Sequence, residues 1–235
     1  MEFKQFFEPE SSTFTYLLGC PQTRQAVLID PVECDVELYV KELEARGLKL
    51  VYTLETHVHA DHVTAADALR QRLGSKSVVH RDAGAMCGDL LVTDGVHVVV
   101  GSLDIEVRYT PGHTSGCVSY RVGDRIFTGD ALLIGGCGRT DFQQGDAGTL
   151  YDSIHRHVFS LPDDTLIYPG HDYNGNTVTT VGAEKAHNKR LGGGRSREDF
   201  VKLMSELKLA YPKQIDVALP ANQACGRVAA PQQSA

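Results

Sequence analysis

Short runs of apolar residues, separated by glycine, proline and polar residues, dominate the hydrophobic pattern of this chain. Short apolar or alternating runs predict strands, whereas apolar positions three or four residues apart predict helices. The expected strands are residues 13–18, 26–29, 48–54, 77–79, 96–100, 105–109, 118–121, 126–128 and 166–168.

Four segments have the spacing of helices. Gly47 follows the first at the position of a C-terminal cap, and Ser196 precedes the last at the position of an N-cap. No linker interrupts the pattern, so we expect a single domain spanning residues 1–235, with a disordered tail after about residue 226. The expected helices are residues 35–46, about 63–73, the region around 150–158 and the residues after 196.

The composition is that of a globular protein, with 42% apolar and 23% charged residues. A net charge of −7 argues against a nucleic-acid partner, because phosphate binding relies on clustered Lys and Arg. No apolar run is long enough to cross a membrane, and the N-terminus lacks the pattern of a targeting segment. We therefore expect a cytoplasmic protein. Its six cysteines form no CxxC pair, which favours free thiols.

Polar clusters follow four of the expected strands. His57, His113, Asp130 and His171 each come just after an apolar run. Strand ends can meet at one rim of a sheet, where loops carry chemistry on a rigid scaffold. We therefore expect these four side chains to lie close together.

The segment His57-Val58-His59-Ala60-Asp61-His62 holds three imidazoles and one carboxylate. In extended backbone His57, His59 and Asp61 would point to the same side. Imidazole and carboxylate suit divalent metals such as zinc or iron. A single histidine is more often structural than a ligand, but this grouping would be costly to bury without a metal. The segment predicts a metal site.

In order and spacing, HxHxDH, the TPGHT around His113, the FTGD ending at Asp130 and the PGHD around His171 resemble the metallo-β-lactamase superfamily. The resemblance implies an αββα sandwich, in which two packed mixed sheets carry helices on their outer faces and the metal site lies at one edge.

Further stretches resemble one branch, the persulfide dioxygenases, also called sulfur dioxygenases. These stretches are residues 129–134, 137–145 and 168–173, and residues 13–19 and 214–222 extend the resemblance. The resemblance implies one Fe(II) per chain, held by His57, His113 and Asp130 in a facial triad whose other positions are open. It also implies surrounding residues that orient the ligands and handle protons, namely His59, Asp61, His62 and His171.

The substrate implied by the resemblance is glutathione persulfide, oxidised by O2 and water to sulfite with release of glutathione. Its two carboxylates require cations, for which Arg139 is the first choice, with Tyr173 as a hydrogen-bond donor. Arg139 could instead pair internally with Asp141 or Asp146. A basic group is a second candidate or a solvated face, and comprises Lys185, Lys189, Arg190, Arg195 and Arg197.

Two further functions stay open from the sequence. All seven positions that bind two metals in hydrolytic members are present, so a glyoxalase II-like dinuclear thioester hydrolase fits the ligands. A non-catalytic sulfide- or redox-responsive module is the third alternative. We expect no room for a fused rhodanese domain, so a rhodanese or a sulfide:quinone oxidoreductase of the same pathway would be a separate protein. Family habit favours a homodimer.

Overall fold

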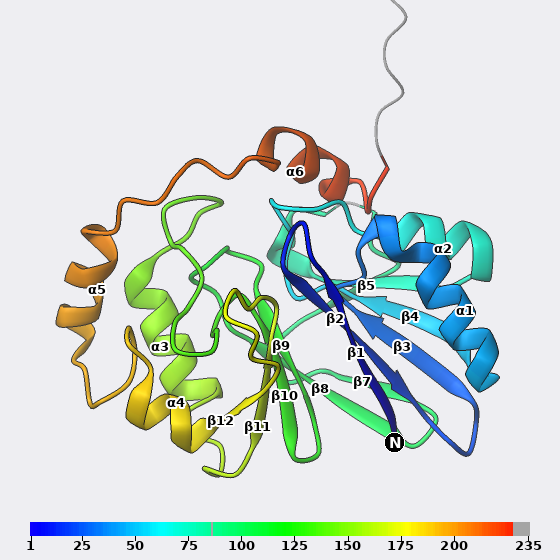
Figure 1. Cartoon of the computed structure of the whole chain (residues 1–235), viewed down its shortest axis with the longest axis horizontal. Helices are drawn as coiled ribbons and strands as arrows, with labels where there is room; N and C mark the ends of the chain where they lie inside the picture. The colour runs from blue at the N-terminus through cyan, green and yellow to red at the C-terminus, as the bar shows by residue number, and fades with distance from the viewer. Residues whose placement is uncertain (86, 228–235) are drawn as a thin grey trace, which may run out of the picture.

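The computed structural model describes residues 1–85 and 87–227, whose strands form two six-stranded sheets (Figure 1). Both sheets are mixed, since each combines parallel with antiparallel pairs. The first sheet has the order β1-β2-β3-β4-β5-β6. Its strands are β1 (Glu2–Glu8), β2 (Thr13–Gly19), β3 (Gln25–Ile29), β4 (Lys49–Leu54), β5 (Lys76–His80) and β6 (Leu90–Val92).

The second sheet has the order β12-β11-β10-β9-β8-β7. Within it β10 and β11 run parallel, so their carboxyl ends reach the same edge. Its strands are β7 (His97–Val100), β8 (Leu103–Tyr109), β9 (Val118–Val122), β10 (Arg125–Gly129), β11 (Leu166–Pro169) and β12 (Thr179–Thr180).

The largest hydrophobic cluster lies between the two sheets. Because strand side chains alternate between faces, β2 places Phe14 and Tyr16 in this cluster and turns Leu17 to the outer face. In β10, Phe127 faces the other sheet and Ile126 faces outward. Both faces of the inner strands are buried, which explains their nearly continuous apolar sequences.

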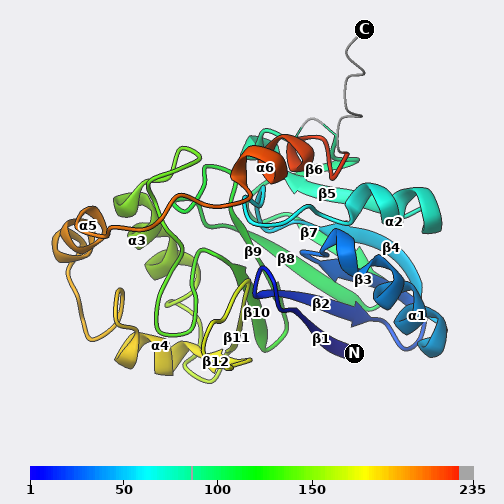
Figure 2. The same ribbon diagram turned by 45° about the horizontal axis from the view of Figure 1, so that its top comes forward.

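Helices cover the outer face of each sheet, α1 and α2 on the first and α3 and α4 on the second, and α5 packs against α3 (Figure 1). The αββα sandwich expected from the sequence is therefore confirmed. A sixth helix, α6, lies across one end of the molecule (Figure 2). The helices are α1 (Val36–Arg46), α2 (Ala66–Leu73), α3 (Ala147–His157), α4 (Val181–His187), α5 (Arg197–Ser205) and α6 (Ile215–Gln223).

Both expected helix caps are present. Gly47 has φ of 60° and ends α1, while the Ser196 hydroxyl accepts the Asp199 N–H at the start of α5. The sequence did not predict β1, β6, β12, α4 and α6. The strands among them lie at sheet edges, or are too short, to show a clear apolar alternation. Proline inside α6 hid that helix.

The expectation of free thiols is wrong for two cysteines, since Cys87 and Cys225 form a disulfide. They lie 138 residues apart, so no spacing motif could reveal the pair. Most of the expected disordered tail, residues 228–235, lies outside the described residues, but Arg227 is ordered enough to pair with Asp67. Among the described helices, none has the length and apolar character needed to cross a bilayer.

Gly129, the last residue of β10, lies against Thr56 in the loop that follows β4. It has φ of 50°, and a Cβ there would lie 2.3 Å from the Thr56 hydroxyl oxygen beside His57. Gly123, in the turn before β10, has φ of 58°, and a Cβ placed there would have no heavy atom within 4 Å among the described residues. Both glycines have a left-handed backbone conformation, but only at Gly129 would an added Cβ collide with a neighbouring residue.

We expect Gly129→Ala to lower the free energy of unfolding by about 1–3 kcal/mol more than Gly123→Ala, because only the former overpacks its surroundings. Chemical denaturation of the two variants and the parent chain measures this difference. Equal losses would show that the left-handed conformation alone matters and that the contact between Gly129 and Thr56 is tolerant.

Candidate metal centre

Strands of both sheets bring the candidate ligands together. His57 follows β4 of the first sheet, while His113 and Asp130 follow β8 and β10 of the second. One ligand atom from each of these three residues lies within 4.8 Å of the others. The convergence expected from the strand ends is confirmed, and the meeting point is where the two sheets adjoin.

His57 is buried and neutral. Burial, and then the neighbouring His59, hold the pKa of the His57 imidazole well below its ordinary value. Its Nδ1 lies 3.0 Å from the Thr56 hydroxyl oxygen, which leaves Nε2 free. A neutral imidazole with one nitrogen held by the protein is the form that binds a metal.

His113 and Asp130 are fixed by the loop that follows β10. His113 Nδ1 donates to the carbonyl oxygen of Arg139 at 2.7 Å, and its Nε2 lies 3.6 Å from Asp130 Oδ2. The N–H of Gly138 donates to the Asp130 carbonyl oxygen at 2.7 Å. Asp130 Oδ1 is buried and has no hydrogen-bond partner among residues 1–85 and 87–227. A bound cation would satisfy this oxygen.

His171 and Asp61 lie beside the three candidate ligands. His171 Nε2 is 3.5 Å from Asp130 Oδ1 and 3.6 Å from Asp61 Oδ2, and its Nδ1 donates to the Ser12 carbonyl oxygen at 3.1 Å. Burial opposes a charge on His171, but Asp130 and Asp61 outweigh it and raise the pKa. His62 Nδ1 lies 2.9 Å from Asp61 Oδ2.

His59 faces two carboxylates in the interior. Its Nε2 lies 3.2 Å from Asp30 Oδ1 and 3.5 Å from Glu55 Oε2. Burial opposes the imidazolium, but these carboxylates prevail and hold the His59 pKa well above its ordinary value. The predicted strand that ends at residue 54 is confirmed as β4. The residues after it form a loop, so His57 and His59 do not share the direction that an extended backbone would give them, and they have different partners.

A cavity of about 390 Å³ opens over the three candidate ligands. One wall is the segment between α5 and α6, and another is the loop that follows β10. Its lining includes apolar side chains such as Leu133 and Leu209. The polar residues that line it include His57, His113, Asp130, His171, Tyr173 and Arg190. Tyr173 is 71% exposed at its mouth.

Arg139 and Arg190 both border this cavity but differ in their partners. Arg139 Nε and Nη2 donate to the two Asp141 carboxylate oxygens at 2.6 and 2.8 Å, and Nη1 donates to the Ala210 carbonyl oxygen. Arg190 Nη1 donates to the Cys137 carbonyl oxygen at 2.6 Å. No described carboxylate lies within 4.0 Å of the Arg190 guanidinium. Arg139 is therefore paired with a carboxylate, whereas Arg190 has no carboxylate partner among the described residues.

Sequence reasoning missed Asp30, Glu55 and Asn222. Asp30 follows the buried strand β3 as Asp130 follows β10, so the same pattern could have revealed it. Asn222 lies far along the chain in α6, and its side chain bonds to the backbone of the loop carrying His59. No local signal in the sequence indicates that contact.

Comparison with known proteins places this site in a family. The metallo-beta-lactamase superfamily profile matches residues 9–171. The human protein named persulfide dioxygenase ETHE1, mitochondrial, is 53% identical over 95% of this chain and 88% of its own length. The chain belongs to the persulfide dioxygenases of this superfamily. The crystal structure titled ETHE1 from Myxococcus xanthus superposes with a TM-score of 0.95 at 53% identity, covering 97% of this chain and all of that one.

Sequence similarity supports the persulfide dioxygenase assignment more strongly than the hydrolase alternative. A hydroxyacylglutathione hydrolase from a Polaromonas strain is 34% identical over 74% of this chain and 68% of its own length. That similarity is lower in identity and in coverage than the similarity to the human protein. Membership of the persulfide dioxygenases makes the chain an oxidoreductase that binds a metal.

We expect His57→Ala, His113→Ala or Asp130→Ala each to abolish tight metal binding, because each removes one of three ligand atoms. His59→Ala should leave much of the metal in place and slow turnover, since its Nε2 faces Asp30 and Glu55. Metal analysis and activity on the same preparations measure both effects.

The exposed histidine His97 is the matched control, and His97→Ala should retain metal and activity. Loss of metal from His59→Ala as complete as from His57→Ala would contradict the division between ligands and surrounding residues.

Proposed function

We propose that this chain is a persulfide dioxygenase with one Fe(II), held by His57, His113 and Asp130. The observation that carries the proposal is the three-ligand cluster within 4.8 Å in a chain 53% identical to a protein of that name. Two imidazoles and one carboxylate are the ligand set of non-haem iron oxygenases. The unpaired Asp130 Oδ1 and the anchored Nδ1 atoms of both histidines fit a metal at this point.

The substrate that we propose is glutathione persulfide, which is converted with O2 and water to sulfite and glutathione. When bound, the iron supplies positions for the persulfide sulfur and for O2. The cavity of about 390 Å³ over the ligands is open to solvent on the side of Tyr173, which suits a tripeptide body extending outward. The Tyr173 phenol donates a hydrogen bond to that body.

The two glutathione carboxylates require a cation in the wall of the cavity. Arg139 would have to leave Asp141 to bind one, whereas the Arg190 guanidinium bonds only a carbonyl oxygen and a thiol sulfur among the described residues. We propose Arg190 as the main carboxylate-binding residue. Arg139 stabilises the wall of the cavity through its bonds to Asp141 and to the Ala210 carbonyl oxygen.

His171 is the group that we propose to handle protons beside the substrate. Its Nε2 lies between Asp130 and Asp61, and the two carboxylates favour a proton at that atom. The Ser12 carbonyl oxygen fixes the ring through Nδ1. His171 can therefore donate a hydrogen bond toward the ligand side of Asp130 while remaining in a fixed orientation.

The cellular setting is also a proposal. We propose a cytoplasmic enzyme that acts with a separate rhodanese or sulfide:quinone oxidoreductase, and that forms a homodimer. The name of the human relative includes the word mitochondrial. A sulfur-transfer protein of this kind would produce the glutathione persulfide that the enzyme consumes.

Protein purified without chelator should contain about one iron per chain and consume O2 only when glutathione persulfide is added. Metal analysis under anaerobic conditions and an oxygen electrode measure these properties. S-lactoylglutathione is the matched control substrate, which a glyoxalase II-like enzyme would hydrolyse. Two tightly bound metals per chain together with thioester hydrolysis would establish the dinuclear alternative.

Arg190→Ala should raise KM and lower kcat/KM by about 1.5–3 kcal/mol, the scale of a charge-assisted hydrogen bond, without loss of iron. Arg139→Ala should mainly lower the melting temperature, because it breaks contacts within the protein. Measuring KM, melting temperature and iron on both variants compares two arginines of the same wall. A larger KM effect in Arg139→Ala would reverse the two roles.

A further inference from the structure

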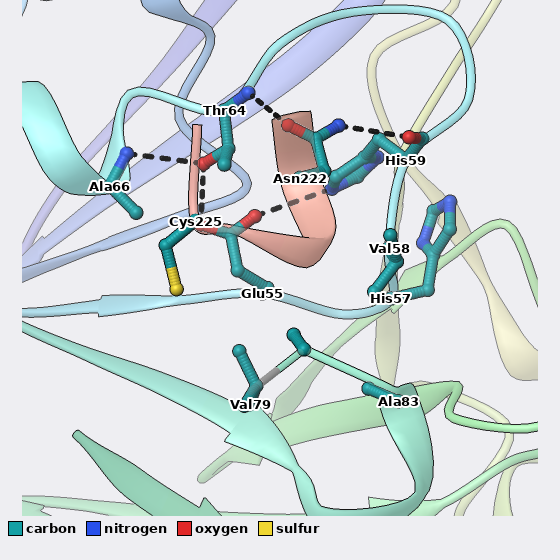
Figure 3. Close-up of a pocket in the computed structure, with 11 residues that line it drawn as sticks. Glu55, His57, Val58, His59, Thr64, Ala66, Val79, Ala83, Asn222 and Cys225 are labelled. Atoms are coloured by element: carbon teal, nitrogen blue, oxygen red, sulfur yellow. Dashed lines mark hydrogen bonds and ion pairs between the residues drawn. The ribbon is translucent and has the colours of Figure 1, made fainter. Parts of the chain in front are cut away.

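The helix α6 binds the backbone of residues 59–64 through the side chain of Asn222, which is 4% exposed. Asn222 Oδ1 accepts the Thr64 N–H at 2.9 Å. Its Nδ2 donates to the carbonyl oxygens of His59 at 2.9 Å and His62 at 2.7 Å. Figure 3 shows the carboxamide pointing at both sides of the loop. Both amide donors and the oxygen of one side chain are thus used on one segment.

Within the loop of residues 55–64 the Thr64 hydroxyl donates to Glu55 Oε1 at 2.7 Å, and the rest of its fold depends on other parts of the chain. The loop leaves the sheet at Leu54 and contains no strand, so its buried backbone groups need partners from elsewhere. The start of the loop is held by Asp30, which accepts the Thr56 N–H at 2.7 Å. Its far end is held by Asn222. His57, the ligand from this loop, lies between these anchors, and its neighbours Thr56 and Val58 accept bonds at their carbonyl oxygens from the Val118 N–H and from Gln143 Nε2.

The helix that presents Asn222 is itself fastened at several points. Cys225, three residues after Asn222, forms the disulfide with Cys87, and its carbonyl oxygen accepts the Asp67 N–H. Leu219 packs against the cluster that contains Val58. Figure 3 places Asn222 and Cys225 on the same ribbon segment beside the loop. A side chain on so fixed a support can define the position of the backbone that it binds.

We propose that Asn222 is a positioning residue of the metal centre, which fixes the backbone of residues 59–64 so that His57 meets His113 and Asp130. This inference rests on the proposed function in that it concerns the same metal site. Without the carboxamide, the His59 and His62 carbonyl oxygens and the Thr64 N–H lose their partners inside the protein. The loop then relaxes, and His57 is no longer held at the distance that the other two ligands require.

The test compares Asn222→Ala with Tyr151→Phe in the full chain. Tyr151 also binds the backbone of a distant segment, since its hydroxyl donates to the Arg195 carbonyl oxygen at 2.8 Å, and it lies in α3 away from the candidate ligands. Both variants should melt at a lower temperature. Only Asn222→Ala should raise the dissociation constant for Co²⁺, by about 10- to 100-fold, the usual effect of removing a residue that orients metal ligands.

Co²⁺ affinity is measured by competition with a chelator, and the visible absorption of the bound ion reports whether its ligand geometry has changed. The same change in dissociation constant for both variants, or no change for Asn222→Ala, would overturn the proposal. If Asn222→Ala does not fold, Asn222→Asp keeps Oδ1, removes both donors and is judged by the same two outcomes. No persulfide is present, so a failure of the proposed dioxygenase activity would be a separate result.

Discussion

The distance between the two sheets is the constraint on which the metal centre depends. His57 follows a strand of the first sheet, whereas His113 and Asp130 follow strands of the second, so no single sheet could bring the three candidate ligands together. The apolar cluster between the sheets therefore sets the ligand spacing as well as the stability. Gly129 lets the two halves touch where the ligands meet, because any larger residue there would collide with Thr56.

Around the ligands, polar groups are arranged in two directions. Toward the cavity, His171 and Asp61 face the ligand Asp130. Toward the interior, Asp30 and Glu55 engage His59 and draw its Nε2 into an ion pair. A proton at Nε2 would occupy the lone pair with which that nitrogen could bind a metal. His59 therefore has carboxylate partners that lie outside the cluster of His57, His113 and Asp130.

The sequence was informative where function depends on local pattern. The strand ends carrying His57, His113 and Asp130 could be predicted, because each joins an apolar run to a ligand residue within a few positions. The pairing of Arg139 with Asp141, which the sequence left open as an alternative, is present in the structure. The roles of Asn222 and of the Cys87–Cys225 disulfide could not be predicted, since both depend on contacts between residues over a hundred positions apart.

The cross-link between Cys87 and Cys225 also divides the chain into a closed ring and two free ends. His113 and Asp130 lie inside the ring, whose two cysteines are 138 positions apart, while His57 lies on the N-terminal side outside it. In the chain-entropy description, closing a ring of this size removes about 5 kcal/mol of conformational freedom from the unfolded chain. Much of the folding stability, and with it the meeting of the three ligands, is therefore tied to the thiol–disulfide balance around the protein.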